Sequence, residues 1–143
     1  MPKFRLSTMS DWGTIQPAMI PVPRLGVYEN LCDYHIDLVY GNRSFQRIIE
    51  KGFHLDGASI PRWAWSTTST PFHPRLQRGA ITHDDGYQNN PWNLERREWD
   101  EIAYLTWRED YVNRYITRKM DIGLKLGGWY AWNKYRKNDK GKS

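Results

Sequence analysis

A histidine, a tyrosine and an aspartate fall at spacings that bring them together on two neighbouring helices. His83 and Tyr87 are four residues apart, so they share one face of a helix. His83 lies eight residues before Pro91, the centre of the predicted loop, and Asp100 lies nine after it. On antiparallel helices the two are therefore at the same height. An aspartate there can accept the imidazole N–H and leave the second ring nitrogen as a base.

Carboxylates near this pair could hold a cation. Asp84 follows His83 directly and points about a quarter-turn away around the helix, where it could bind a cation or cap the site. Asp56 and Ser59 come from an earlier loop that contains Gly57. A loop of this kind offers carbonyl groups beside its carboxylate, which is the oxygen-rich environment that Ca²⁺ or Mg²⁺ prefers.

The elements that position these residues follow from periodicity. Residues 33–50 alternate polar and apolar side chains around a Gly-Asn pair, which predicts a β-hairpin, and residues 51–56 can add a third short strand. Residues 74–88 repeat apolar and small residues at helical spacing, and a second helix is expected from Asn93, as its cap, to Tyr115. The short loop between them makes these helices antiparallel.

A third helix is expected from Met120 to Tyr135, where three glycines lower helical propensity or mark a close helix crossing. The sequence therefore predicts an α+β fold: a small N-terminal antiparallel sheet, an antiparallel helix hairpin and a C-terminal helix. We expect an extended arm without packed elements over residues 1–30, a single domain over 31–135 and a flexible basic tail over 136–143.

Composition excludes several classes of protein. The single cysteine of the 143 residues, Cys32, cannot form an internal disulfide, and a thiolate zinc site is excluded as well. The net charge of +5 comes mostly from the last ten residues, which is typical of a solubilising tail rather than a nucleic-acid interface. The distribution of apolar residues along the sequence indicates no targeting signal and no transmembrane segment, so a soluble protein is expected.

These motifs resemble an uncharacterised domain family that is common in bacteriophages and prophages. Its pattern joins a GF-x-x-DGASIPR loop, here Gly52 to Arg62, to an HD-x-x-Y helix and a later aspartate, here Asp100. The resemblance runs from the hairpin near Tyr34 to the Gly-Trp-rich C-terminal helix. It implies a phage protein made in the host cytoplasm, with the virion as a second expected location.

The His83-Asp84-x-x-Tyr87 run with the later Asp100 is also similar to the catalytic core of phospholipase A2 enzymes, including the disulfide-free version in parvovirus capsid proteins. This resemblance implies that His83 is the general base for a water, that Tyr87 and Asp100 orient it, and that Asp84 binds Ca²⁺. The DGASIPR run departs from that family's calcium loop, and the disulfide framework of its secreted members is missing.

The resemblances also assign roles in the loop that begins at Asp56. Asp56 is expected to be a second metal ligand. The expected loop and substrate contacts are Gly57, Ser59 and Arg62.

Three functions of different classes remain open. The first is a metal-assisted hydrolase that acts on a lipid or another ester with His83 as general base. The second is a non-catalytic tail, baseplate or head-completion protein that contacts other virion proteins or copies of itself. The third is a small inhibitor of a host or defence protein. A structural alternative for the cluster is a satisfied polar network that fixes the helix register.

Overall fold

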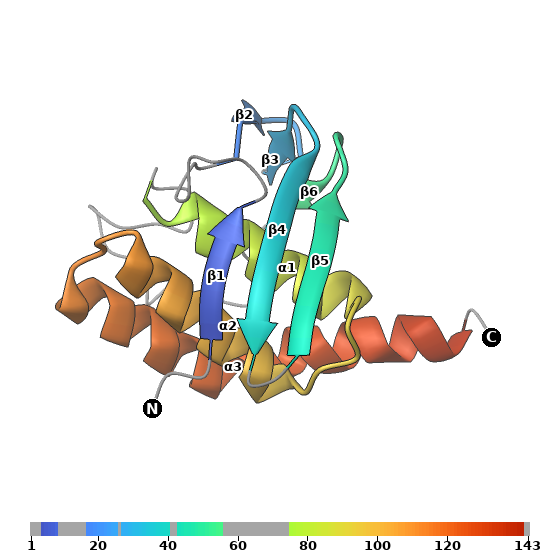
Figure 1. The fold of residues 1–143 in the computed structure, drawn as a ribbon. Helices are drawn as coiled ribbons and strands as arrows, with labels where there is room; N and C mark the ends of the chain where they lie inside the picture. The colour runs from blue at the N-terminus through green and yellow to red at the C-terminus, as the bar shows by residue number, and fades with distance from the viewer. Residues whose placement is uncertain (1–3, 9–16, 26, 41–42, 56–74, 142–143) are drawn as a thin grey trace. The chain divides into compact units, whose positions relative to one another are not determined.

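The computed structural model describes residues 4–8, 17–25, 27–40, 43–55 and 75–141 (Figure 1). The chain forms two compact units, Met1–Asp56 and Gly57–Ser143. The described strands belong to the first unit and the described helices to the second. The expected α+β class is confirmed, because antiparallel strands come first and helices follow.

The predicted hairpin is the centre of a three-stranded antiparallel sheet. β4 (Tyr34–Tyr40) and β5 (Arg43–Ile49) pair along their whole length, and β1 (Phe4–Thr8) adds to the other side of β4. Tyr34 and Ile36 on β4 are buried, whereas the residue between them is only half-buried. This alternation follows from the two-residue repeat of a strand and is the pattern that the sequence showed.

A second antiparallel sheet has the strand order β2-β3-β6, with β2 (Met19–Val22), β3 (Val27–Asn30) and β6 (His54–Leu55). The third short strand expected within residues 51–56 is confirmed, but it pairs with β3 instead of with the hairpin. The buried side-chain amide of Asn30 donates to the carbonyl of Ile49 at 3.1 Å and so links β3 to the end of β5.

Residues 1–30 contain β1, β2 and β3, so the expectation of an extended arm without packed elements is wrong. The prolines of this segment indicated breaks in structure. Pro21 nevertheless lies within β2, at the edge of its sheet, where a residue without an N–H is tolerated. The partner of β1 is β4, far along the chain, and such a pairing leaves no local pattern. The predicted domain boundaries stay predictions.

The helix hairpin is confirmed as α1 (Gln77–Asn89) and α2 (Arg96–Glu109). The predicted end of the second helix at Tyr115 is wrong, because α2 ends at Glu109 and Tyr115 belongs to the next helix. Asn93 was expected to cap the second helix, and this is wrong. Glu95 is the N-cap, in a capping box with Glu98 in which each side chain accepts from the backbone of the other. Asn93 has a φ of 54° and belongs to the turn before the cap.

The third helix, α3 (Arg114–Gly141), is longer at both ends than predicted. It begins before Met120 because Asn113 accepts the N–H of Tyr115 on its side-chain oxygen at 2.7 Å, as an N-terminal cap does. It also continues as far as Gly141, so residues 136–141 of the expected tail are helical, and their expected flexibility stays a prediction. None of the described helices is long and apolar enough to span a bilayer.

The three helices pack against one another in the second unit (Figure 1). α1 approaches α2 closely at Gly86, where a Cβ would collide with the ring of Trp99. One core cluster joins the three helices: Leu76, Ala103, Trp107, Val112, Met120 and Leu124. This packing fixes the register of α1 against α2, and the register places the candidate site.

Candidate functional site

The side chains of His83, Tyr87 and Asp100 meet between α1 and α2. Oδ1 of Asp100 lies 2.7 Å from Nε2 of His83 and accepts a hydrogen bond from the Tyr87 hydroxyl at 2.6 Å. The two rings on α1 lie one turn apart, with centroids separated by 4.1 Å. All three residues are buried, and His83 is 2% exposed. The predicted proximity of His83 and Asp100 is confirmed, whereas their catalytic roles stay predictions.

Asp100 fixes the orientation of the His83 ring. An ionised carboxylate accepts hydrogen bonds but cannot donate them, so the proton on Nε2 lies toward Asp100. In the neutral imidazole the proton is then on Nε2, and Nδ1 is the basic nitrogen. The arrangement can therefore hold one tautomer of His83 and stabilise the imidazolium that forms when Nδ1 takes a proton.

Tyr87 acts as a hydrogen-bond donor to the same carboxylate oxygen. Burial raises the pKa of its hydroxyl far above the ordinary value, and the negative charge of Asp100 and the hydrogen bond to it raise the pKa further. Tyr87 is consequently a neutral phenol over the whole physiological range. It can orient Asp100, but it cannot serve as a phenolate nucleophile or as a base.

Arg96 is a member of the cluster that was not among the site residues expected from the sequence. Its Nη1 forms an ion pair with Oδ2 of Asp100 at 3.6 Å and donates to the carbonyl of Leu124 on α3 at 3.3 Å. Both oxygens of Asp100 therefore face a donor or a cation. The signal was present in the sequence, because an arginine four residues before an aspartate on a helix is within ion-pair distance.

α3 closes the third side of the cluster. A Cβ at Gly128 would lie 2.5 Å from the hydroxyl oxygen of Tyr87, so only glycine leaves room for this ring. The ring of Trp132 meets Tyr87 edge-on, with centroids 5.3 Å apart. Nη2 of Arg136 donates to the carbonyls of Tyr87 at 2.7 Å and Gln88 at 3.1 Å, at the end of α1. The three glycines of this helix were expected either to lower its helical propensity or to mark a close crossing, but the sequence did not indicate which residue a glycine would meet.

Two further carboxylates lie next to His83 on α1. Asp84 and Asp85 are both buried, and Asp85 accepts a hydrogen bond from the Asn89 amide at 2.9 Å. Within the part of the chain that the structure describes, no group of three or more His, Cys, Asp or Glu side chains is arranged to hold a metal ion. Asp84 could supply one carboxylate oxygen, and a cation there would take its other ligands from backbone carbonyls, water or residues outside that part.

Four of the expected site residues lie outside the described residues. They are the loop residues Asp56, Gly57, Ser59 and Arg62. Their expected roles as metal ligand and as loop or substrate contacts stay predictions.

The fold and the cluster define a class: a small α+β protein with a buried His-Asp-Tyr cluster at the junction of three helices. The family model described as "Protein of unknown function (DUF1353)" matches residues 34–121, and the chain belongs to this family. Membership of an uncharacterised domain family is thus confirmed. The match begins with β4, as expected, but ends inside α3, before the Gly-Trp-rich part. No curated protein and no solved structure matches the chain.

Proposed function

We propose that this protein is a metal-assisted hydrolase of ester bonds, with His83 as general base and a lipid as the favoured substrate. One observation carries the proposal: the 2.7 Å hydrogen bond between His83 and Asp100, on a carboxylate that Tyr87 and Arg96 also bind. An imidazole whose tautomer and direction are fixed by a carboxylate is the usual arrangement for taking a proton from water.

In the proposed reaction, Nδ1 of His83 removes a proton from a water molecule as its oxygen attacks the ester carbonyl. The same proton is then delivered to the alcohol that leaves, so His83 returns to its starting state. Asp100 stabilises the transient imidazolium, and Tyr87 and Arg96 hold Asp100 in place. A divalent cation bound at Asp84, for which Ca²⁺ is the first candidate, would polarise the carbonyl and stabilise the oxyanion.

A second candidate is a non-catalytic role, such as that of a virion component. It is favoured by the burial of the cluster, since a His83 side chain that is 2% exposed suits a polar network that fixes helix register. In that case the hydrogen bonds of Asp100 stabilise the fold and perform no chemistry.

Turnover by the whole chain separates the two candidates. The substrates would be a short-chain ester and a dispersed diacyl phospholipid, each assayed with added Ca²⁺ and with EDTA. The hydrolase predicts release of acid or fatty acid that EDTA abolishes. Absence of hydrolysis in every condition, by a protein shown to be folded, would remove the hydrolase and leave the structural role.

The proposed cation site has its own test. A cation that binds only the folded state raises the melting temperature by mass action. We expect Ca²⁺ to raise it in the wild type and in Asp139→Asn, whose carboxylate is exposed on α3, but not in Asp84→Asn. Equal shifts in the wild type and Asp84→Asn would exclude Asp84 as a ligand.

A further inference from the structure

The outer face of α3 carries a continuous row of exposed apolar side chains. Tyr115, Ile122, Leu126 and Trp129 are spaced seven, four and three residues apart, so they follow one line along the helix. Their exposed fractions are 74%, 42%, 62% and 52%. We call these four residues the α3 stripe, and the exposed Tyr130 lies beside it.

The α3 stripe is distinct from the face that packs into the core. Thr117, Met120 and Leu124 are completely buried on the opposite side of the helix, together with Gly128. α3 therefore has two apolar faces, of which one is covered by α1 and α2. A row of large apolar side chains that remains exposed on a small protein is typical of a binding surface.

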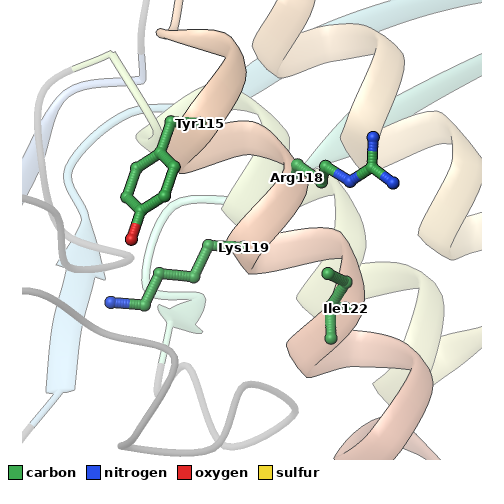
Figure 2. Close-up of a pocket in the computed structure, with 4 residues that line it drawn as sticks. All are labelled: Tyr115, Arg118, Lys119 and Ile122. Atoms are coloured by element: carbon green, nitrogen blue, oxygen red, sulfur yellow. The ribbon is translucent and has the colours of Figure 1, made fainter.

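Basic side chains border the α3 stripe. Arg118 and Lys119 line a hollow of about 260 Å³ with Tyr115 and Ile122. Figure 2 shows Tyr115 and Lys119 extending side by side from successive turns of α3, whereas Arg118 points to the opposite side. Cations thus lie on both sides of the apolar row, which is the pattern of a helix that lies flat in a membrane interface.

The net positive charge of α3 indicates which kind of partner could bind to the α3 stripe. The helix contains eight Lys and Arg residues against two Asp, a net charge of +6, whereas the whole chain has +5. A second copy that docked through the same face would bring two strongly positive helices together, which is unfavourable. The complementary partner is anionic and has an apolar layer beneath its charges.

We propose that the α3 stripe binds an anionic lipid surface, with the helix axis parallel to the bilayer plane. Ile122 and Leu126 enter the boundary between the headgroups and the acyl chains, and the two aromatic residues of the stripe lie at headgroup depth. Arg118 and Lys119 bind lipid phosphates. A lipid fits better than a nucleic acid, because two aliphatic side chains occupy the centre of the row and offer no surface for base stacking. The inference rests on α3 alone and is independent of the chemistry at His83.

Co-sedimentation of the full chain with vesicles tests this proposal. We expect binding to phosphatidylcholine vesicles that contain phosphatidylglycerol, weakening as salt is added, and little binding to phosphatidylcholine alone. Leu126→Ser with Trp129→Ser should weaken binding at least about tenfold, since both side chains lose their burial in lipid. Arg118→Glu with Lys119→Glu should weaken it at least as much.

The matched control compares two isoleucines of similar exposure. Ile122→Ser, at 42% exposed, should weaken vesicle binding, whereas Ile48→Ser on β5, at 45% exposed, should leave it unchanged. Circular dichroism would verify that each variant is folded. Failure to bind any anionic vesicle, or equal effects of the two isoleucine variants, would overturn the proposal.

Two other outcomes would also overturn it and would identify the alternative. If vesicles are not bound but a DNA or RNA oligonucleotide is, and stripe variants lose that binding, the partner is a nucleic acid. If vesicles are not bound and the wild type forms a dimer that the stripe variants dissociate in sedimentation equilibrium, the stripe binds a second copy.

Discussion

Asp100 accepts hydrogen bonds from His83 and Tyr87 on one oxygen and faces Arg96 with the other. At the scale of single residues, this carboxylate joins the side chains of His83, Tyr87 and Arg96. Because the site is buried, loss of any donor removes an interaction with a charge that water cannot replace. Variants of the residues that contact Asp100 therefore measure how much each contact contributes to the free energy of unfolding.

Tyr87→Phe removes one donor and keeps the ring. We expect a loss of about 2 kcal/mol in the free energy of unfolding, the usual size for a hydrogen bond to a charged group. Urea denaturation measures it. Tyr115→Phe, at an exposed position on α3, is the control and should change stability by less than about 0.5 kcal/mol. Equal effects of the two variants would contradict the assigned hydrogen bond.

The raised pKa of Tyr87 predicts a dependence on alkaline pH. The folded chain keeps the phenol neutral, whereas the unfolded chain ionises it near its ordinary pKa of 10.0. The contribution of the raised Tyr87 pKa to the free energy of unfolding is therefore fully present below the ordinary pKa. Above it, this contribution falls by about 1.4 kcal/mol for each pH unit. The stability gap between wild type and Tyr87→Phe should shrink by about that amount at about pH 11. A gap that is constant with pH would show that Tyr87 ionises equally in both states.

At the scale of elements, the crossing of α3 over α1 depends on Gly128. Gly128→Ala should destabilise the protein by about 1–3 kcal/mol, because the new Cβ would lie 2.5 Å from the Tyr87 hydroxyl oxygen. Asn133→Ala, an exposed position of the same helix, controls for helix propensity and should be neutral or slightly stabilising. Thermal or urea unfolding reports both.

A double variant sharpens the Gly128 prediction. In the Tyr87→Phe background the oxygen that the Cβ meets is gone, so the cost of Gly128→Ala should fall. A cost that is the same in both backgrounds would show that the strain arises elsewhere in the crossing.

The turn between α1 and α2 depends on Asn90. It has a φ of 41°, and its Oδ1 accepts from the Leu94 N–H at 2.9 Å and the Trp99 indole N–H at 2.8 Å. Asn90→Ala should cost about 2–3 kcal/mol, since it loses both bonds and cannot relax at positive φ. Asn90→Gly should cost less, because glycine adopts that φ freely. If the glycine variant were as unstable as the alanine variant, backbone strain would contribute nothing to the cost of Asn90→Ala.

The elements that could be predicted from the sequence are those that depend on residues close to one another along the chain. Counting residues from the loop placed His83 opposite Asp100, because two regular helices joined by a short turn leave little freedom of register. The pairing of β1 with β4 could not be predicted in this way, since the partner is distant in sequence. Glu95 as a cap and the early start of α3 depend on side-chain hydrogen bonds that propensity alone does not reveal.

At the scale of the whole molecule, the region matched by the family model includes the polar cluster of the helical unit but not most of the α3 stripe. Residues 34–121 include His83, Tyr87, Asp100 and Arg96, but they end before Gly128 and before most of the α3 stripe. The proposed chemistry therefore lies inside the matched region. The proposed lipid surface extends beyond it along α3, so the two proposals can be tested separately.

The initial rate of ester hydrolysis by wild type and His83→Gln is the most direct measure of whether His83 is the general base. His54→Gln is the matched control, because His54 also pairs with a carboxylate, that of Glu29 at 3.1 Å, but its side chain is exposed. We expect a loss of about 10²–10⁴-fold in rate for His83→Gln and no loss for His54→Gln, with both variants folded. A folded His83→Gln that hydrolyses ester at the wild-type rate would contradict this role for His83.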